Sequence, residues 1–159
     1  MRRDDFERLY DEHAQALFAF LSYRVNNRAL AEDLLADTFE RVLTAKRRYD
    51  PRRASEKTWI YSIALNVLRS HLRRADAERR ALDRSAVGAG GDDLGEHVEH
   101  RDTVRRALAV LSEEEREAVA LRFGADLTVP EIAKLLDEPL TTVEGRVYRA
   151  LRKLRADLT

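Results

Sequence analysis

The chain has 159 residues and a mass of 18.3 kDa, enough for one domain of ordinary size or two small ones. It carries 29 basic and 29 acidic side chains and no cysteine, which excludes disulfides, cysteine-ligated zinc and thiol nucleophiles. The longest apolar run, Ala16 to Leu21, is far shorter than the ~20 residues of a membrane span, and the charged N-terminus resembles no signal peptide. Rich in leucine and alanine, with only three prolines, the composition predicts a soluble, cytoplasmic, all-α protein.

Apolar residues at helical spacing predict three helices in the first half of the chain. They span residues 5–24, 28–47 and 56–81. Pro51 ends the second segment, because proline cannot donate a backbone hydrogen bond, and Ser55 stands where the third helix begins.

A glycine-rich stretch interrupts the helical pattern. Residues 85–95 contain four of the six glycines, and each glycine destabilises a helix by about 1 kcal/mol relative to alanine. We therefore predict a flexible linker at 82–101 between two small helical domains at 1–81 and 102–159. The alternative is a long internal loop in one domain, an arrangement uncommon in compact proteins.

Positive charge is concentrated before this linker. Residues 46–84 carry twelve basic and five acidic side chains, a net charge of +7 in a chain that is neutral as a whole. Such an excess indicates a surface that faces a polyanion. For any single arginine, a solvated helix face remains the alternative.

Three Ser/Thr-x-x-Glu patterns in the second half are typical of capping boxes, which mark helix starts. They pair Ser112 with Glu115, Thr128 with Glu131, and Thr141 with Glu144. Together with a preceding helix, they predict helices at 102–110, 113–123, 129–137 and 142–157.

The last two helices are joined by a short turn, which is helix-turn-helix patterning. One side of the final helix has a buried spacing, formed by Val143, Val147, Ala150, Leu151, Leu154 and Leu158. The opposite side carries Thr142, Arg146, Arg149 and Lys153, which suits a helix lying against phosphates in a major groove. The alternative is a solvated face whose cations interact with the helix dipole.

Three motifs precede the linker in a fixed order: Ala31–Phe39 (AEDLLADTF), Thr58–Asn66 (TWIYSIALN) and His71–Arg74 (HLRR). With the helix-turn-helix, they resemble the small two-domain sigma factors of bacterial RNA polymerase, the extracytoplasmic-function group. The resemblance covers nearly the whole chain outside the linker. It implies a non-enzymatic factor, without cofactor or metal, that directs core polymerase (its largest and second-largest subunits) to promoter DNA and is controlled by an anti-sigma factor.

The resemblance implies a polymerase-binding surface on the second helix. In the family, the stretch matching Ala31–Phe39 binds the clamp helices of the largest subunit. The acids here can pair with a basic partner surface, although ordinary solvated acids are the alternative. The predicted residues are Glu32, Asp33, Asp37 and Glu40.

The resemblance also implies two DNA sites. Family members use the segment matching Tyr49–Arg74 to open the minus-ten element and hold one flipped base near the position of Asn66, where an amide can read its edge. Aromatic rings offer stacking surfaces and arginines hold the strand, although Trp59 and Tyr61 alternatively pack the core and Asn66 alternatively makes a structural hydrogen bond. The predicted minus-ten residues are Tyr49, Trp59, Tyr61, Asn66, Arg69, Arg73, Arg74 and Arg80. The predicted minus-thirty-five residues are Thr141, Thr142, Arg146, Arg149 and Lys153.

Some positions depart from the family pattern. Asp137 stands in the turn where glycine is usual, and Glu144-Gly145 replaces a basic residue and a serine. Glycine at that place lets the helix approach the DNA backbone closely.

Two other functions are compatible with parts of the sequence. An autonomous helix-turn-helix regulator would bind duplex DNA as a dimer, but no dimerisation heptad is evident. A metalloenzyme would use His97 and His100 with Glu96 and Glu99, but these lie beside the glycine-rich linker without a convincing further ligand.

Overall fold

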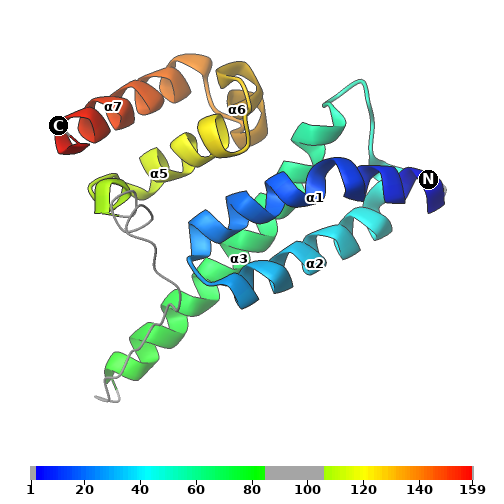
Figure 1. The fold of residues 1–159 in the computed structure, drawn as a ribbon, viewed down its shortest axis with the longest axis horizontal. Coiled ribbons are helices and arrows are strands. Elements are labelled where there is room, and N and C mark those ends of the chain that lie inside the picture. Colours follow the sequence, from blue (N-terminus) through cyan, green and yellow to red (C-terminus); the bar gives the residue numbers. More distant parts are fainter. Residues whose placement is uncertain (1–2, 85–105, 159) are drawn as a thin grey trace.

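The computed structural model describes residues 3–84 and 106–158, and the regular structure in these ranges is entirely helical (Figure 1). The predicted all-α class is therefore confirmed. Most of the predicted linker, 82–101, lies outside the described residues, as does the start of the helix predicted at 102–110. Residues 106–109 of that helix are helical.

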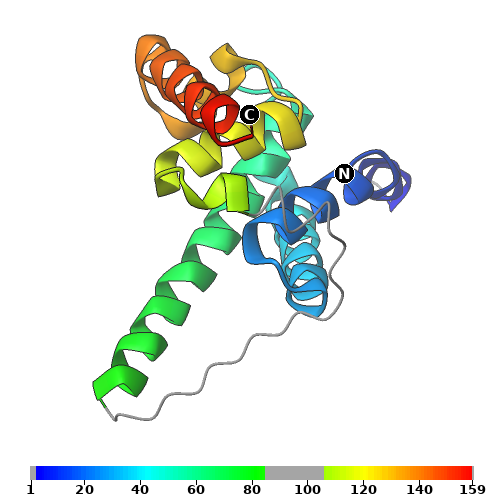
Figure 2. The same ribbon diagram turned by 60° about the vertical axis from the view of Figure 1, so that its left-hand side comes forward.

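The N-terminal unit consists of α1 (Arg3–Val25), α2 (Arg28–Ala45) and α3 (Glu56–Arg84), with a 3-10 turn at Lys46–Arg48. α1 and α2 run side by side in opposite directions, and α3 packs against them (Figure 1). The last turns of α3 project beyond the other helices (Figure 2), three residues further than predicted.

The tight connection between α1 and α2 depends on two consecutive asparagines. Asn26 adopts the left-handed conformation, with φ 53°, which asparagine tolerates better than most residues. Asn27 then caps α2, because its side chain accepts a hydrogen bond from the Leu30 amide at 3.0 Å.

Apolar side chains from all three helices fill the space between them, and the aromatic ring of Phe20 meets that of Tyr61 edge-on with centroids 5.5 Å apart. The fully buried members of this core include Leu9, Leu17, Leu21, Val42, Ile60, Ala64 and Leu68.

The C-terminal unit consists of residues 106–109, α5 (Glu113–Val119), α6 (Val129–Leu136) and α7 (Leu140–Leu158). α5 continues into a π turn at Ala120–Gly124, where a continuous α-helix was predicted. Two predicted capping boxes are confirmed: the Glu115 amide donates to the Ser112 hydroxyl at 3.1 Å, and the Glu131 amide donates to the Thr128 hydroxyl at 3.2 Å.

The third predicted capping box, Thr141 with Glu144, is wrong. α7 already begins at Leu140, so Thr141 lies inside its first turn. The Pro139 carbonyl accepts hydrogen bonds from the amides of Thr142 and Val143 at 3.1 and 3.2 Å, which places the start of the helix earlier.

The two units pack against each other, and their buried side chains form one continuous cluster. α1 contacts the π turn, and α3 contacts α6. Ion pairs cross the interface from Arg24 to Glu113 and from Arg69 to Glu117, and the Lys57 ammonium donates to the Asp126 carbonyl at 3.1 Å. None of the helices in the described ranges combines the length and apolar character that crossing a membrane requires.

Candidate nucleic-acid interface

The predicted polymerase-binding acids lie on the outer side of α2. Glu32, Asp33 and Glu40 are exposed, and Asp37 is half-buried. Arg28 approaches Glu32 at 3.9 Å and Arg41 approaches Asp37 at 3.6 Å, distances at which exposed pairs of this kind contribute little. This side of α2 therefore exposes carboxylates that are only weakly engaged within the chain.

Tyr49 and Trp59 form a tilted pair of rings where the loop before α3 meets that helix. Their ring centroids lie 4.7 Å apart with an interplanar angle of 33°, and the Tyr49 hydroxyl donates to the Ala54 carbonyl at 2.9 Å. Burial raises the pKa of Tyr49 above its usual value. Ser55 caps the following helix by accepting from the Thr58 amide at 3.1 Å. The pair thus ties residues 49–55 to the start of α3, and Trp59 stays partly exposed.

The prediction that Tyr61 stacks on DNA is wrong. Tyr61 is 1% exposed and its ring contacts Phe20 inside the core. Residues two apart on a helix point about 200° away from each other, so Trp59 faces the loop while Tyr61 faces α1. For Tyr61, packing in the core is therefore the correct alternative.

Exposed polar side chains follow one another along α3. Asn66, Arg69 and Arg73 are all exposed, and Arg69 also donates to the Glu117 carboxylate of α5 at 2.9 Å. Arg74 and Arg80 are exposed further along the same helix. Asn66, Arg69 and Arg73 are spaced i, i+3 and i+7 and therefore share one exposed face of α3, on which Arg69 is paired with the other unit.

α6 and α7 form a helix-turn-helix whose shared core is small. Ile132 and Ala133 of α6 are buried, as are Val143 and Val147 of α7. Asp137 ends α6 in the left-handed conformation, with φ 57° and ψ 47°. This is the backbone geometry for which glycine is usual, and it explains the departure at this position, since aspartate tolerates it better than most residues.

The basic face predicted on α7 is only partly free. Thr141, Thr142 and Arg149 are exposed, but Arg146 is paired with Glu138 at 2.6 Å and Lys153 with Glu115 at 2.8 Å. Of the four residues predicted on this side of α7, Thr142, Arg149 and Lys153 are exposed, although Glu115 engages the Lys153 ammonium. The expectation for Arg146 is corrected, because its side chain is only 14% exposed and is engaged by Glu138.

Sequence reasoning missed two exposed side chains beside Arg149. Tyr148 is 63% exposed, and the Arg152 guanidinium lies 5.9 Å from the centre of its ring. The spacing of Thr141, Tyr148 and Arg152 (i, i+7, i+11) was a signal that could have found this stripe.

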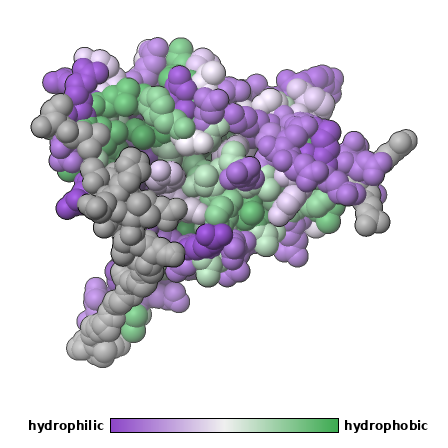
Figure 3. Space-filling view, in the orientation of Figure 1, coloured by the Kyte–Doolittle hydropathy of each residue, from purple (hydrophilic) through white to green (hydrophobic). Residues whose placement is uncertain are grey.

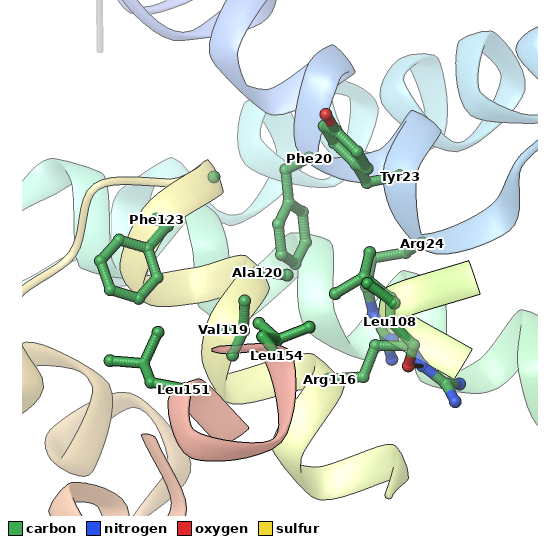
Figure 4. A pocket seen from close by; sticks show the side chains of 12 residues that line it. Phe20, Tyr23, Arg24, Leu108, Arg116, Val119, Ala120, Phe123, Leu151 and Leu154 are labelled. Carbon is green, nitrogen blue, oxygen red and sulfur yellow. Dashed lines mark hydrogen bonds between the residues drawn. The ribbon is translucent and has the colours of Figure 1, made fainter. Parts of the chain in front are cut away.

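An apolar groove of about 340 Å³ lies where α1 meets the C-terminal unit (Figure 4). Phe20 and Tyr23 line it from α1, Phe123 from the π turn, and Leu151 and Leu154 from α7. Leu151, predicted to be buried, is 38% exposed and faces this groove. Figure 3 shows an apolar area on this side of the C-terminal unit.

The four residues of the alternative metal site, at 96, 97, 99 and 100, lie outside the described residues. Among the residues described, Glu12, His13 and Glu56 bring possible metal-ligand atoms within 4.8 Å of one another. Arg8, however, donates to Glu56 at 3.2 and 2.7 Å, so a guanidinium already neutralises that carboxylate. Burial lowers the pKa of the His13 imidazole below its usual value.

Comparison with known proteins matches both units. Residues 9–78 match the family model for sigma-70 region 2, and residues 101–154 match that for sigma-70 region 4. The chain is 30% identical to the extracytoplasmic-function sigma factor SigX of Bacillus subtilis, with 96% of this chain and 82% of SigX covered. It is 33% identical to CarQ of Myxococcus xanthus, with 96% and 88% covered. It is 28% identical to BldN of Streptomyces coelicolor, but spans only 59% of that protein's length.

Two solved structures share the fold. The sigma factor RpoE, in complex with the anti-sigma factor NepR from Bartonella quintana, superposes with a TM-score of 0.78 at 25% identity, covering 97% of this chain and 96% of RpoE. CnrH, in complex with the cytosolic domain of CnrY, superposes with a TM-score of 0.76 at 26% identity, covering 99% of this chain and 89% of CnrH. The chain belongs to the sigma-70 family, in its extracytoplasmic-function group.

Proposed function

We propose that this sigma factor directs core RNA polymerase to specific promoters by using three separate surfaces. The acidic side of α2 contacts the polymerase, the open side of α3 captures melted minus-ten DNA, and α7 enters the minus-thirty-five major groove. The observation that carries the proposal is that the Asn66 and Arg73 face, the α2 acids and the exposed part of α7 are all accessible on one scaffold.

At the minus-ten element, the proposed roles divide by chemistry. The Asn66 amide reads the edge of an unstacked base, the Trp59 ring offers a partly exposed face for stacking, and Arg73 holds the strand. Arg74 and Arg80 add phosphate contacts further along α3. Arg69 joins them once its pairing with Glu117 is released.

At the minus-thirty-five element, Thr141, Thr142 and Arg149 supply the exposed contacts of α7. Lys153 adds to the positive potential near the phosphates. Strand opening draws on binding energy, and the proposed factor has no catalytic activity of its own.

In vitro transcription with core polymerase on a promoter library tests the proposal. We expect initiation that depends on the full chain at a defined subset of promoters, and no dependence at any promoter would reject it. Asn66→Ala is expected to impair open-complex formation more, and Arg149→Ala duplex binding more. Equal effects of the two variants at both stages would contradict the division between units.

We also propose that an anti-sigma factor controls this protein. Support comes from two structural relatives: RpoE, with a TM-score of 0.78, was solved with the anti-sigma factor NepR, and CnrH, with a TM-score of 0.76, was solved with the cytosolic domain of CnrY. Affinity purification from the native cell extract tests this. Recovery of a small protein that inhibits transcription by the holoenzyme is expected, and recovery of polymerase without any inhibitor would contradict it.

A further inference from the structure

Arg146 lies in the second turn of α7, but its guanidinium group points back to the turn that precedes the helix. Nη1 donates to Oε1 of Glu138 at 2.6 Å, and Nη2 donates to Oε2 at 2.9 Å, so the pair is bidentate. The Arg146 side chain is only 14% exposed. The hydrogen bonds from Arg146 lower the pKa of the Glu138 carboxyl more than any other contact does, so this carboxyl stays ionised.

Glu138 is fixed on its other side as well. Its backbone amide donates to the Ala133 carbonyl near the end of α6 at 3.0 Å. One residue therefore joins the end of α6 to the second turn of α7. The bidentate pair therefore adds a constraint of fixed geometry to the apolar contact between α6 and α7.

Arg149 has a different environment on the same helix. It is exposed, and a Cβ placed on Gly145 would come within 3.1 Å of its Nη1, so glycine gives its guanidinium room to lie along α7. Thr142, Gly145 and Arg149 are spaced i, i+3 and i+7, and therefore share one side of the helix. For Arg146 to bind a phosphate, it would have to leave Glu138 as an unpaired carboxylate beside DNA.

We propose that Arg146 is a positioning residue for duplex DNA, which acts through Glu138 to fix the orientation in which α7 presents Thr142 and Arg149. This inference rests on the proposed function of the C-terminal unit. It follows that Glu138, although it is an acid in the turn before α7, favours the binding of duplex DNA.

The opposite expectations for Glu138→Gln make the inference testable. The probe is a duplex enriched by the wild-type holoenzyme from a pool of random promoter-length DNA, and its affinity is measured at several salt concentrations. If the pair positions α7, Glu138→Gln weakens binding by about tenfold, since a misoriented helix loses a base contact of that size. If Arg146 instead contacts phosphate, removing the competing carboxylate strengthens binding. Glu144→Gln is the matched control, because it removes an exposed carboxylate from α7 without touching the turn.

Reversal of the pair gives a second readout. Glu138→Arg with Arg146→Glu is expected to recover most of the affinity that either single change loses, although position 146 then carries a carboxylate that cannot bind phosphate. The double variant Glu138→Gln with Arg146→Gln, which leaves the net charge unchanged, is expected to keep the salt dependence of the wild type, whereas loss of a phosphate contact lowers the slope by about one. Binding of each variant to core polymerase checks that the chain is folded.

Three results would overturn the inference: tighter binding by Glu138→Gln, no recovery in the reversed pair, or a reduced salt slope for the double variant Glu138→Gln with Arg146→Gln. Failure of the proposed function has a different signature. In that case the wild-type holoenzyme enriches no duplex at all, before any variant is compared.

Discussion

The Tyr61 hydroxyl is buried between α3 and α1 with no hydrogen-bond partner among the described residues. An unpaired buried polar group costs about 1–3 kcal/mol. Tyr61→Phe removes this group and keeps the edge-on contact with Phe20, so we expect the free energy of unfolding to rise by ~1 kcal/mol. Denaturant titration measures it. Tyr49→Phe is the control and is expected to lower stability, because it loses the bond to the Ala54 carbonyl.

The same residue gives the protein a dependence on alkaline pH. Burial raises the pKa of Tyr61 from 10.0 to about 12, so the folded state holds this proton more tightly than the unfolded state. Its contribution to stability is fully present below the unfolded pKa of 10.0 and is lost as pH rises towards about 12. Between pH 10 and about 12, denaturant titration is expected to show a smaller loss of unfolding free energy for Tyr61→Phe than for the wild type. Equal losses would contradict the assignment.

The sequence could predict which side chains on α3 and α7 are polar, but not which of them are free. Helical spacing identifies Asn66 and Arg149 as surface residues, and both are exposed. Spacing does not reveal that Arg146 meets an acid in the turn or that Arg69 meets an acid of the other unit. Those contacts depend on the angles between helices, which no local pattern contains.

Helix starts follow local chemistry closely, and this can be measured on the three candidate caps. Ser112→Ala and Thr128→Ala are each expected to lower the free energy of unfolding by ~1 kcal/mol, because each hydroxyl accepts from an otherwise unpaired amide. Thr141→Ala is the matched control, since this residue lies inside α7. Thermal denaturation checks all three. A loss at Thr141 equal to the other two would contradict the observed start of α7.

Local sequence predicted the order and approximate bounds of the helices because capping residues and apolar spacing act within one or two turns. It did not predict the π turn at Ala120–Gly124. There the Ala125 amide bonds to the Ala120 carbonyl and the Leu127 amide to the Leu121 carbonyl, while Leu121 and Leu127 are both buried. Apolar periodicity alone cannot distinguish such a widened turn from a regular one.

At the scale of the whole molecule, the packing of the two units against each other is open to direct test. Glu117 is 8% exposed and its carboxylate is paired with Arg69 across the interface. Glu117→Gln weakens this charge-assisted bond, so we expect a larger radius of gyration in small-angle X-ray scattering. Glu114→Gln, an exposed acid on the same helix, is the control. An unchanged radius for Glu117→Gln would show that the remaining contacts across the interface, polar and apolar, hold the units together without this pair.

Two anionic groups compete for the Arg69 guanidinium. One is the Glu117 carboxylate, and the other, by the proposed function, is the phosphate backbone of the melted strand. Since one side chain cannot satisfy both, the two associations are thermodynamically antagonistic. A change that strengthens the Arg69–Glu117 pair therefore weakens the binding of the melted strand through Arg69. A substitution far from every nucleotide can therefore lower the activity of the factor, because it favours the form in which the two units are packed together.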